Sequence, residues 1–375
     1  MLKFLHIADL HLDSRFVGVS ASESVSRRNE MRKVLKNALD FASVEGCDAV
    51  LISGDLFDSE LYTKDTLDFL RESFASMPDC KFIITPGNHD PYNSASPYRL
   101  SGFSDNVTVF DSEELTAVSF DELDLTVYGY AFTSSVYKKS PLDGFSMRSK
   151  TKYNVLCAHT DLDVPTSPYA PIQSSQLEKA GFDYAALGHI HTSEDIVKTG
   201  KTVYAYSGCI AGRDFSEHGE KGAILVSMDV RSGKKRVRAE RVRFCPWVYR
   251  TESIDLTDTA SEEEAISLIG ERIKPYCITE EIEYIFRLRL TGDVSYDIDA
   301  ALLRQRFAPL GVAEIVSETV NSYGSLALDE DYSLRGEFYR ILKPMLLSEN
   351  IEERKRASRA LKYGLSALSG SEIDI

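Results

Sequence analysis

Six of the seven histidines fall at or beside the ends of predicted strands in the first part of the chain. Five of these six stand in short polar motifs that interrupt apolar segments. Imidazole nitrogens and carboxylate oxygens are ligands that catalytic sites use for divalent cations, so the pattern predicts metal chemistry. In chain order the motifs are Asp9-Leu10-His11, Gly54-Asp55-Leu56-Phe57-Asp58, Gly87-Asn88-His89-Asp90, Ala158-His159-Thr160 and Gly188-His189-Ile190-His191.

Each motif has an ordinary structural alternative when it is taken alone. Asp9 and Asp55 would also serve as turn or helix-capping aspartates, Asn88 as part of a turn, and His159 as a buried core histidine. Two motifs, however, place a pair of ligands on one side of an extended chain, because residues two apart point the same way. These pairs are Asp9 with His11, and His189 with His191.

Together the motifs predict a metal site more strongly than any one of them does alone, because they follow successive strands of an alternating strand–helix pattern. Expected strands at residues 4–8, Ala49–Ser53 and Lys81–Thr85 alternate with expected helices at 22–44 and Lys64–Ala75. In such α/β folds the strand ends meet at one rim, where side chains far apart in sequence converge. The oxygen and nitrogen ligands, with no thiolate, favour two divalent ions of manganese, iron or zinc over a structural zinc site.

The remaining segments predict further strands, a small second domain and a helical tail. Strands are expected within 107–130 and at 154–158, 184–187, 203–207, 223–229 and 235–244, with a helix at Ser174–Ala180. The pattern changes near Pro246, where strand 253–256, helix Glu262–Ile273, strand 281–290, helix 298–307 and strand 313–319 follow. After a linker at 321–324, helices are expected at 334–347 and 351–368. We therefore predict domains at 1–248 and 249–322, and a linker with C-terminal helices at 323–375.

Composition limits the broad class of the protein. The 375 residues are 43% hydrophobic and 27% charged, which is ordinary for a globular protein, and the net charge of −15 argues against a broad basic nucleic-acid surface. The six scattered cysteines form no C-x-x-C pair, which favours reduced thiols. No apolar run approaches the roughly 18 residues of a membrane helix. We expect a cytoplasmic protein without a membrane segment.

The five motifs together resemble the calcineurin-like metallophosphoesterases and, within them, the bacterial SbcD and YhaO exonuclease group. The resemblance is strong over residues 1–245 and extends to the rest only in layout. It implies a four-layer α/β/β/α sandwich, with a smaller α+β capping domain and a helical C-terminal tail. It also implies two divalent metal ions, with manganese expected and iron or zinc as alternatives, that activate water for attack on a phosphate ester.

The resemblance assigns roles to individual residues. One metal would be held by Asp9, His11, Asp55 and His191, and the second by Asp55, Asn88, His159 and His189. His89 would act on the scissile phosphate, with Asp90 orienting it. Archaeal and eukaryotic nucleases of this fold often have histidine where Asp58 stands, so Asp58 receives no role. Arg213, in a loop that resembles one in YhaO-like proteins, is either a phosphate or DNA contact or a solvated arginine.

Three functions stay open. The first is a manganese-dependent DNA exo- or endonuclease acting in repair, and the second is a phosphatase or phosphodiesterase for a small molecule or nucleotide. The third is a scaffold with a structural metal site, against which the His89-Asp90 pair counts. DNA and a coiled-coil ATPase of the SbcC/YhaN kind are the partners implied, and a homodimer is a further alternative.

Two surface features allow both a functional and a structural interpretation. The apolar stripe of the last helix, formed by Ala357, Leu361, Leu365 and Leu368, fits either docking to the ATPase or packing within the chain. A basic hairpin fits either contact with a nucleic-acid backbone or a solvated strand face. Its cations are Lys234, Lys235, Arg236, Arg238, Arg241 and Arg243.

Overall fold

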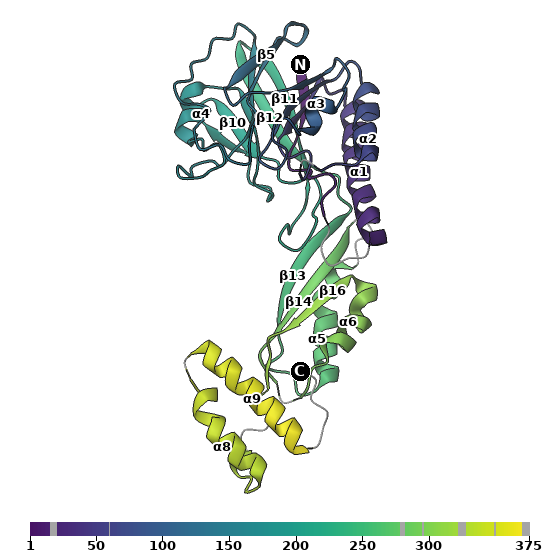
Figure 1. Cartoon of the computed structure of the whole chain (residues 1–375), viewed down its shortest axis with the longest axis vertical. Helices are drawn as coiled ribbons and strands as arrows, with labels where there is room; N and C mark the ends of the chain where they lie inside the picture. Colours follow the sequence, from purple (N-terminus) through teal and green to yellow (C-terminus); the bar gives the residue numbers. More distant parts are fainter. Residues whose placement is uncertain are drawn as a thin grey trace. The chain divides into compact units, whose positions relative to one another are not determined.

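The computed structural model describes residues 1–15, 21–59, 61–277, 282–294, 296–321, 328–348 and 350–369. The chain divides into two compact units, Met1–Val248 and Tyr249–Ile375, which Figure 1 draws in purple to teal and in green to yellow. Both combine helices and sheets, so the expected mixed α/β class is confirmed. Most of the expected linker at 321–324 lies outside the described residues.

The first sheet of unit 1 carries three of the five motifs at its strand ends. Its strands are β1 (Leu2–Ile7), β2 (Ala49–Ser53), β3 (Lys81–Thr85), β4 (Val107–Val109), β11 (Gly222–Arg231) and β12 (Lys234–Arg243), in the order β12-β11-β1-β2-β3-β4. β1 to β4 run parallel. The helices α1 (Ala21–Val44) and α2 (Lys64–Ala75) connect β1 to β2 and β2 to β3. The carboxyl ends of β1, β2 and β3 therefore share one edge.

The second sheet carries the other two motifs, at the ends of β7 (Tyr153–His159) and β8 (Tyr184–Gly188). Its order is β5-β6-β7-β8-β10-β9, and β6, β7, β8 and β10 are parallel. The other strands are β5 (Thr116–Phe120), β6 (Leu125–Gly129), β9 (Val197–Thr199) and β10 (Thr202–Tyr206), with α3 (Pro97–Leu100) before them and α4 (Ser174–Ala180) between β7 and β8.

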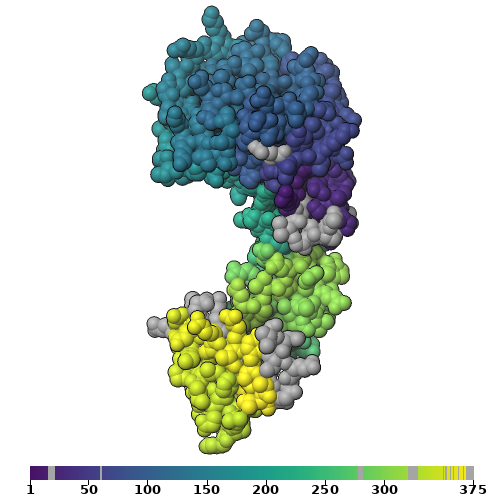
Figure 2. All heavy atoms as spheres, in the orientation of Figure 1, coloured from purple at the N-terminus to yellow at the C-terminus, as the bar shows by residue number. Residues whose placement is uncertain are grey.

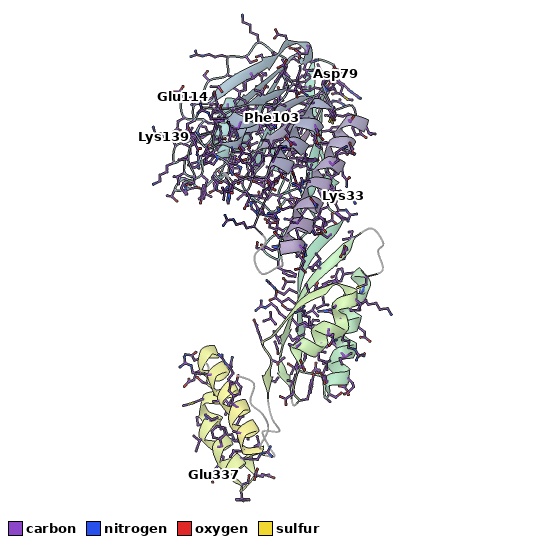
Figure 3. All side chains as sticks on the ribbon, turned by 45° about the vertical axis from the view of Figure 1, so that its right-hand side comes forward. Lys33, Asp79, Phe103, Glu114, Lys139 and Glu337 are labelled. Atoms are coloured by element: carbon purple, nitrogen blue, oxygen red, sulfur yellow. The ribbon has the colours of Figure 1, made fainter. Side chains whose placement is uncertain are left out.

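The two sheets pack face to face. Leu51 and Ile83 of the first sheet share a buried cluster with Val155 and Ala186 of the second. A second cluster joins the opposite face of the second sheet to α4 through Leu177. Figure 1 shows α1 and α2 together on one side of the unit and α4 on the other. Exposed side chains such as Lys33 project from α1 (Figure 3).

His6 lies in β1 between the two sheets and is fully buried. Its Nδ1 lies 3.0 Å from the hydroxyl of Tyr184 on β8. Burial disfavours the imidazolium, and the pKa of His6 is lowered to about 3. In the unfolded chain the same group titrates near about 6.5. Between these two pH values His6 is therefore neutral in the folded protein and protonated in the unfolded chain.

This difference predicts acid sensitivity of unit 1. Above pH ~6.5 the ring is neutral in both states and no penalty arises, whereas between about 6.5 and about 3 each pH unit costs about 1.4 kcal/mol of folding free energy. From pH 6.5 to 5, the wild type should lose about 2 kcal/mol more than His6→Gln. Urea unfolding of both proteins across this pH range measures the difference, and parallel pH profiles would contradict it.

Unit 2 begins with an α+β part. The sheet order is β13-β14-β16, formed by β13 (Trp247–Asp255), β14 (Glu283–Thr291) and β16 (Val312–Ser317), and a second pair joins β15 (Asp293–Val294) to β17 (Val320–Asn321). The helices α5 (Glu262–Ile273) and α6 (Ala300–Phe307) bury Ile269 and Phe307 with Phe286 of β14 in one core. This core is separate from those of unit 1, as an independent α+β fold requires.

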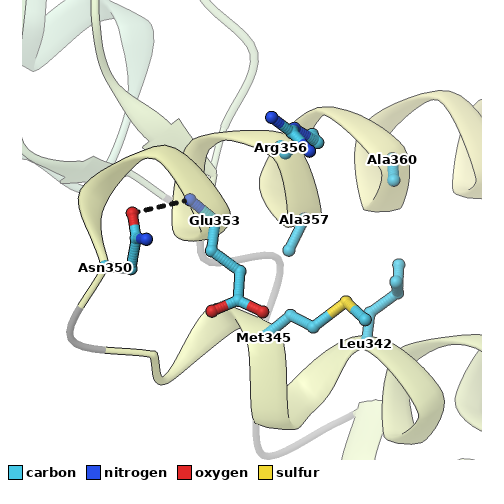
Figure 4. Close-up of a pocket in the computed structure, with 7 residues that line it drawn as sticks. All are labelled: Leu342, Met345, Asn350, Glu353, Arg356, Ala357 and Ala360. Atoms are coloured by element: carbon cyan, nitrogen blue, oxygen red, sulfur yellow. Dashed lines mark hydrogen bonds between the residues drawn. The ribbon is translucent and has the colours of Figure 1, made fainter.

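Two further helices of unit 2, α8 (Leu334–Leu346) and α9 (Ile351–Ser369), pack side by side (Figure 1), and their yellow-green and yellow atoms lie against each other in Figure 2. Leu361 and Leu365 of the expected stripe are buried against Tyr339 of α8, whereas Leu368 is 40% exposed. The stripe therefore packs mainly within the chain. A groove of about 490 Å³ remains between α8 and α9, lined among others by Met345 and Ala357 (Figure 4). Of the helices described, none is both long and apolar enough to cross a membrane.

The expected basic hairpin forms β11 and β12, with Ser232 (φ 50°) and Gly233 (φ 75°) at the turn. Two of its cations are used within the fold. Lys235 pairs with Asp183 at 2.8 Å, and Arg241 donates to the carbonyl of Ser207 at 3.2 Å. These contacts tie the edge strand to the second sheet and favour a structural role for this part of the hairpin.

Candidate metal centre

Four of the expected ligands adopt a backbone conformation that side chains rarely tolerate. Asp9 (φ 51°), His11 (φ 46°), Asp55 (φ 50°) and His189 (φ 102°) all have positive φ angles at the ends of β1, β2 and β8. Such residues cost about 1–3 kcal/mol each and concentrate at functional sites. The strain points to a site whose geometry matters more than local stability.

Backbone hydrogen bonds lock these strand ends together. The N–H of Asp9 donates to the carbonyl of Gly54 at 3.1 Å, and that of His11 donates to the carbonyl of Asp55 at 2.9 Å. The N–H of His189 donates to Asp9 Oδ1 at 3.0 Å, which joins the two sheets. Gly188 is required here, because a Cβ would lie 1.8 Å from the carbonyl oxygen of Ser53.

The first group of ligand atoms comprises Asp9, His11 and His191, with Asp55 beside it. The Nε2 atoms of His11 and His191 lie 3.0 Å apart, and His11 Nε2 lies 3.6 Å from Asp55 Oδ2. These are the four side chains that the family resemblance assigns to one metal. Three are almost fully buried, and His191 is half-buried.

A carboxylate lies behind each of these two imidazoles. Asp58 Oδ1 is 3.2 Å from His11 Nδ1, and Glu217 Oε1 is 2.7 Å from His191 Nδ1. Glu217 only accepts, so His191 Nδ1 carries the hydrogen and His191 Nε2 presents its lone pair, whereas Asp58 lies at ion-pair distance from His11 Nδ1 without hydrogen-bond geometry. The lone pair of His191 Nε2 faces His11 Nε2 at 3.0 Å, and a proton or a metal cation can lie between the two nitrogens. The residues therefore fit a cation at this position.

The second group comprises Asp9, Asp55 and His159, so Asp9 belongs to both groups and Asp55 lies beside the first. His159 Nδ1 lies 3.1 Å from the carbonyl of Ser53, so Nε2 is the nitrogen that can serve as a metal ligand once it is deprotonated. That nitrogen lies 2.8 Å from Asn88 Oδ1 and 3.3 Å from Asp55 Oδ2. Three atoms that can all act as ligands thus face one point, and Asp55 lies next to both groups.

His189 is placed differently from the other expected ligands. Its ring lies beside that of His159, with 5.0 Å between centroids, and its Nε2 is 3.4 Å from Asp161 Oδ1. Of the expected histidine and carboxylate ligands, it alone joins none of the close groups found among the described residues. With Nε2 directed to Asp161, Nδ1 is the nitrogen left to serve as a ligand.

The centre favours positive charge. Burial outweighs the neighbouring histidines and raises the pKa of Asp9, to which the charge of Asp55 adds. Burial alone would lower the pKa of His159, but the charges of Asp55 and Asp9 overcome it and raise that pKa to about 9. His159 thus holds a second proton beside the two carboxylates, and a divalent cation would take the place of that proton.

His89 lies at the rim, where it is exposed. Its N–H donates to Asp55 Oδ1 at 3.0 Å, and its Nδ1 is 3.0 Å from the Asp58 carbonyl. Its ring meets that of His11 edge-on at 4.8 Å, and the two form a third close group with Asp58. His89 therefore stands next to the first metal group without being buried in it.

Asp90, which we expect to orient His89, directs its carboxylate to other groups of the loop. Asp90 is fully buried and accepts hydrogen bonds from the N–H groups of Gly87 at 2.7 Å and Phe57 at 3.0 Å, and from the Tyr98 hydroxyl. Burial and the charge of Asp55 raise its pKa to about 7. Asp90 thus fixes the loop that carries His89 instead of touching its ring.

Arg213 is directed toward protein carboxylates. Its Nη1 lies 3.0 Å from Asp58 Oδ1, and its Nη2 donates to Glu217 Oε1 at 2.5 Å. Contact with phosphate therefore remains a prediction. Glu217 and Asp161 were missed from the sequence, because both lie in loops outside the motifs and only the fold brings them to the histidines. A carboxylate in a loop carries no local pattern that marks it.

Comparison with known proteins gives one family and several relatives. A family model described as calcineurin-like phosphoesterase matches residues 2–193, just over half of the chain. The uncharacterized metallophosphoesterase YhaO of Bacillus subtilis is 26% identical over 74% of this chain and 70% of its own length. The DNA double-strand break repair protein Mre11 of Saccharolobus solfataricus is 27% identical over 56% of this chain and 54% of its own. The SbcD component of the SbcCD nuclease of Staphylococcus epidermidis is 21% identical over 93% of this chain and 95% of its own.

Proposed function

Because the chain belongs to the calcineurin-like phosphoesterase family, we propose that it is a metal-dependent phosphodiester hydrolase that acts on DNA ends. The observation that carries the hydrolase is the position of Asp55, whose Oδ2 lies 3.6 Å from His11 Nε2 and 3.3 Å from His159 Nε2. One carboxylate beside two clusters of ligand atoms is the arrangement that a pair of divalent ions requires.

Two sets of residues would hold the ions. We assign Asp9, His11, Asp55 and His191 to one set, which the first close group supports, and Asp55, Asn88, His159 and His189 to the other, which the contacts of His159 support. Oxygen and imidazole donors without thiolate suit manganese, with iron or zinc as alternatives. When bound, such a pair supplies an activated water and neutralises charge on the phosphate oxygens.

His89 supplies the proton chemistry in this proposal. It is exposed at the rim and its ring adjoins His11, so a phosphate ester at the centre would bring its leaving oxygen to the imidazole. The hydrogen bond between the His89 N–H and Asp55 Oδ1 fixes its backbone. Asp90 holds the preceding turn through Gly87. The imidazolium would protonate the departing sugar oxygen.

The proposal of DNA as substrate draws support from the relatives. The match to the SbcCD nuclease component spans both units of this chain, and two of the three relatives compared are named for DNA repair or nuclease function. We propose that unit 1 is the four-layer α/β/β/α nuclease domain, that residues 249–322 form the α+β capping domain, and that the protein works in the cytoplasm in DNA repair.

Assembly partners are part of the same proposal. We propose that the C-terminal helices dock a coiled-coil ATPase of the SbcC/YhaN kind. On α8, Leu334 and Ile341 are each 69% exposed, and the groove beside Met345 is open between the helices (Figure 4). Apolar side chains exposed along one helix are typical of helix docking. A homodimer is the alternative assembly.

A second candidate function is hydrolysis of a small phosphate ester or nucleotide. The net charge of −15 favours it, because a long polyanion meets net repulsion from such a surface. A small ester needs only the local positive charge of the metal centre.

One comparison of substrates separates the two functions. The full chain with Mn²⁺ is incubated with end-labelled duplex DNA, bis(p-nitrophenyl) phosphate and p-nitrophenyl phosphate, each with wild type and His89→Ala. If DNA is the substrate, we expect Mn²⁺-dependent degradation of the DNA ends that is lost in His89→Ala, with little turnover of the phosphomonoester. Rapid turnover of the monoester with intact DNA would establish the second function instead.

A further inference from the structure

The Arg213 guanidinium lies between two carboxylates. Its Nη1 donates to Asp58 Oδ1 at 3.0 Å, and its Nη2 and Nε donate to Glu217 Oε1 at 2.5 and 3.0 Å. The backbone N–H of Arg213 donates to Glu217 Oε2 at 2.7 Å. A planar guanidinium that binds both carboxylates fixes the distance between them as well as their orientation.

Each of these carboxylates also lies beside the outer nitrogen of one imidazole: Glu217 accepts a hydrogen bond from His191, and Asp58 lies at ion-pair distance from His11. Asp58 Oδ1 is 3.2 Å from His11 Nδ1, and Glu217 Oε1 is 2.7 Å from His191 Nδ1. An unbroken chain of polar contacts therefore leads from His11 through Asp58, Arg213 and Glu217 to His191. The two ends of the chain are the histidines whose Nε2 atoms face each other at 3.0 Å.

The surroundings make this chain rigid. Glu217 is only 3% exposed. Burial opposes its charge, but the hydrogen bonds with His191 and Arg213 outweigh it and hold its pKa well below the usual range. The loop itself is anchored at Gly212, whose carbonyl accepts from Trp247 Nε1 at 2.8 Å, and by Lys221, whose Nζ donates to the His191 carbonyl at 2.9 Å.

The other ligand set is supported separately. The outer nitrogen of His159 faces the carbonyl of Ser53 at 3.1 Å, and that of His189 faces Asp161 Oδ1 at 3.4 Å. Within the part of the chain that the structure describes, the Arg213 side chain donates to Ser14, Asp58 and Glu217, and its Nη2 lies 3.4 Å from His191 Nδ1. The two metal positions thus have independent outer supports.

We propose that Arg213 and Glu217 are positioning residues that set the affinity of one metal position, the one formed with His11 and His191, and leave the other position unchanged. The inference rests on the proposed two-metal function. A carboxylate behind a histidine ligand makes the ring more basic and fixes its orientation, and loss of such a partner typically costs about 10- to 100-fold in metal affinity. Arg213 adds a single rigid connection between two such partners.

Manganese titrations of the full chain test this assignment. Calorimetry and electron paramagnetic resonance count the tightly bound ions and distinguish a lone Mn²⁺ from a coupled pair. Glu217→Gln and Arg213→Lys should each weaken one site by about 10- to 100-fold and leave the other at its wild-type affinity. The matched variant Asp161→Asn should weaken the other metal site, the one assigned to His159 and His189.

The identity of the weakened site follows from the ion that remains. At Mn²⁺ concentrations that fill one site, the spectrum of Glu217→Gln should match that of His191→Ala and differ from that of His189→Ala. If Glu217→Gln fails to fold in a thermal unfolding scan, the same comparison with Arg213→Lys decides.

Two results would overturn the inference while the proposed function stands. One is wild-type affinity at both sites in folded Glu217→Gln and Arg213→Lys. The other is equal weakening of both sites in these variants and in Asp161→Asn, which would mean general support of the centre. A wild-type chain that never takes up two ions would instead end the proposed function, and this inference with it.

Discussion

Replacing Asp55 with asparagine should lower kcat by roughly 10³-fold or more and remove the coupled pair of metal ions. The Asp55 carboxylate is the only expected ligand shared by both metal sets. Its Oδ2 lies 3.3 Å from His159 Nε2 and 3.6 Å from His11 Nε2. Asparagine keeps the size of the side chain but offers one neutral oxygen, so it cannot join two cations with a negative charge.

The control for this variant is Asp40→Asn on α1, where an exposed carboxylate pairs with Lys36 on the surface. It removes the same charge and should leave kcat and metal content unchanged, because exposed ion pairs contribute little. Thermal unfolding of both variants shows whether the fold is kept. A folded Asp55→Asn that retains kcat within tenfold of the wild type would contradict the bridging role.

Replacing His89 with alanine should lower kcat by about 10²- to 10⁴-fold while both metal ions stay bound. His89 is exposed at the rim and its hydrogen bonds connect it to Asp55 Oδ1 through the backbone and to the Asp58 carbonyl through Nδ1. Removal of the ring therefore takes away a proton donor and leaves the buried ligands in place. Single-turnover hydrolysis of labelled DNA, with metal content measured on the same samples, separates the two effects.

His218 provides the matched control, since it is an exposed histidine outside all three groups of ligand atoms. His218→Ala should hydrolyse DNA at the wild-type rate. The role given to His89 fails if His89→Ala is as active as this control, or if it loses a metal ion, because His89 would then act as a ligand.

Several elements could be predicted residue by residue from the sequence. The bounds of β2, β3, α2, α4 and α5 agree with expectation, because each is an apolar or amphipathic run that ends at a polar residue. Thr63 and Ser261, for example, cap α2 and α5 with their side-chain oxygens. β13 was expected at 253–256 but begins at Trp247, since its length depends on pairing with β14, which the local sequence does not reveal.

The candidate metal centre could likewise be predicted from the sequence only in part. The motif residues could be placed at strand ends from the sequence, and the structure brings Asp9, His11, Asp55, Asn88, His159 and His191 together. The residues that contact the outer nitrogens of these histidines, or that fix the loop carrying His89, could not be predicted from the sequence. Glu217 and Asp161 reach the histidines only through loops, and Asp90 uses its carboxylate for Gly87, Phe57 and Tyr98. These contacts depend on tertiary packing, which a spacing rule does not contain.

The most direct test of the two-metal centre is the number of manganese ions that each chain binds. Equilibrium dialysis of the purified wild type against Mn²⁺, followed by elemental analysis, should give two ions per chain, and Asp55→Asn under the same conditions should give at most one. A well-folded wild-type chain that saturates with one ion or none would contradict the central claim that these side chains hold a pair of cations.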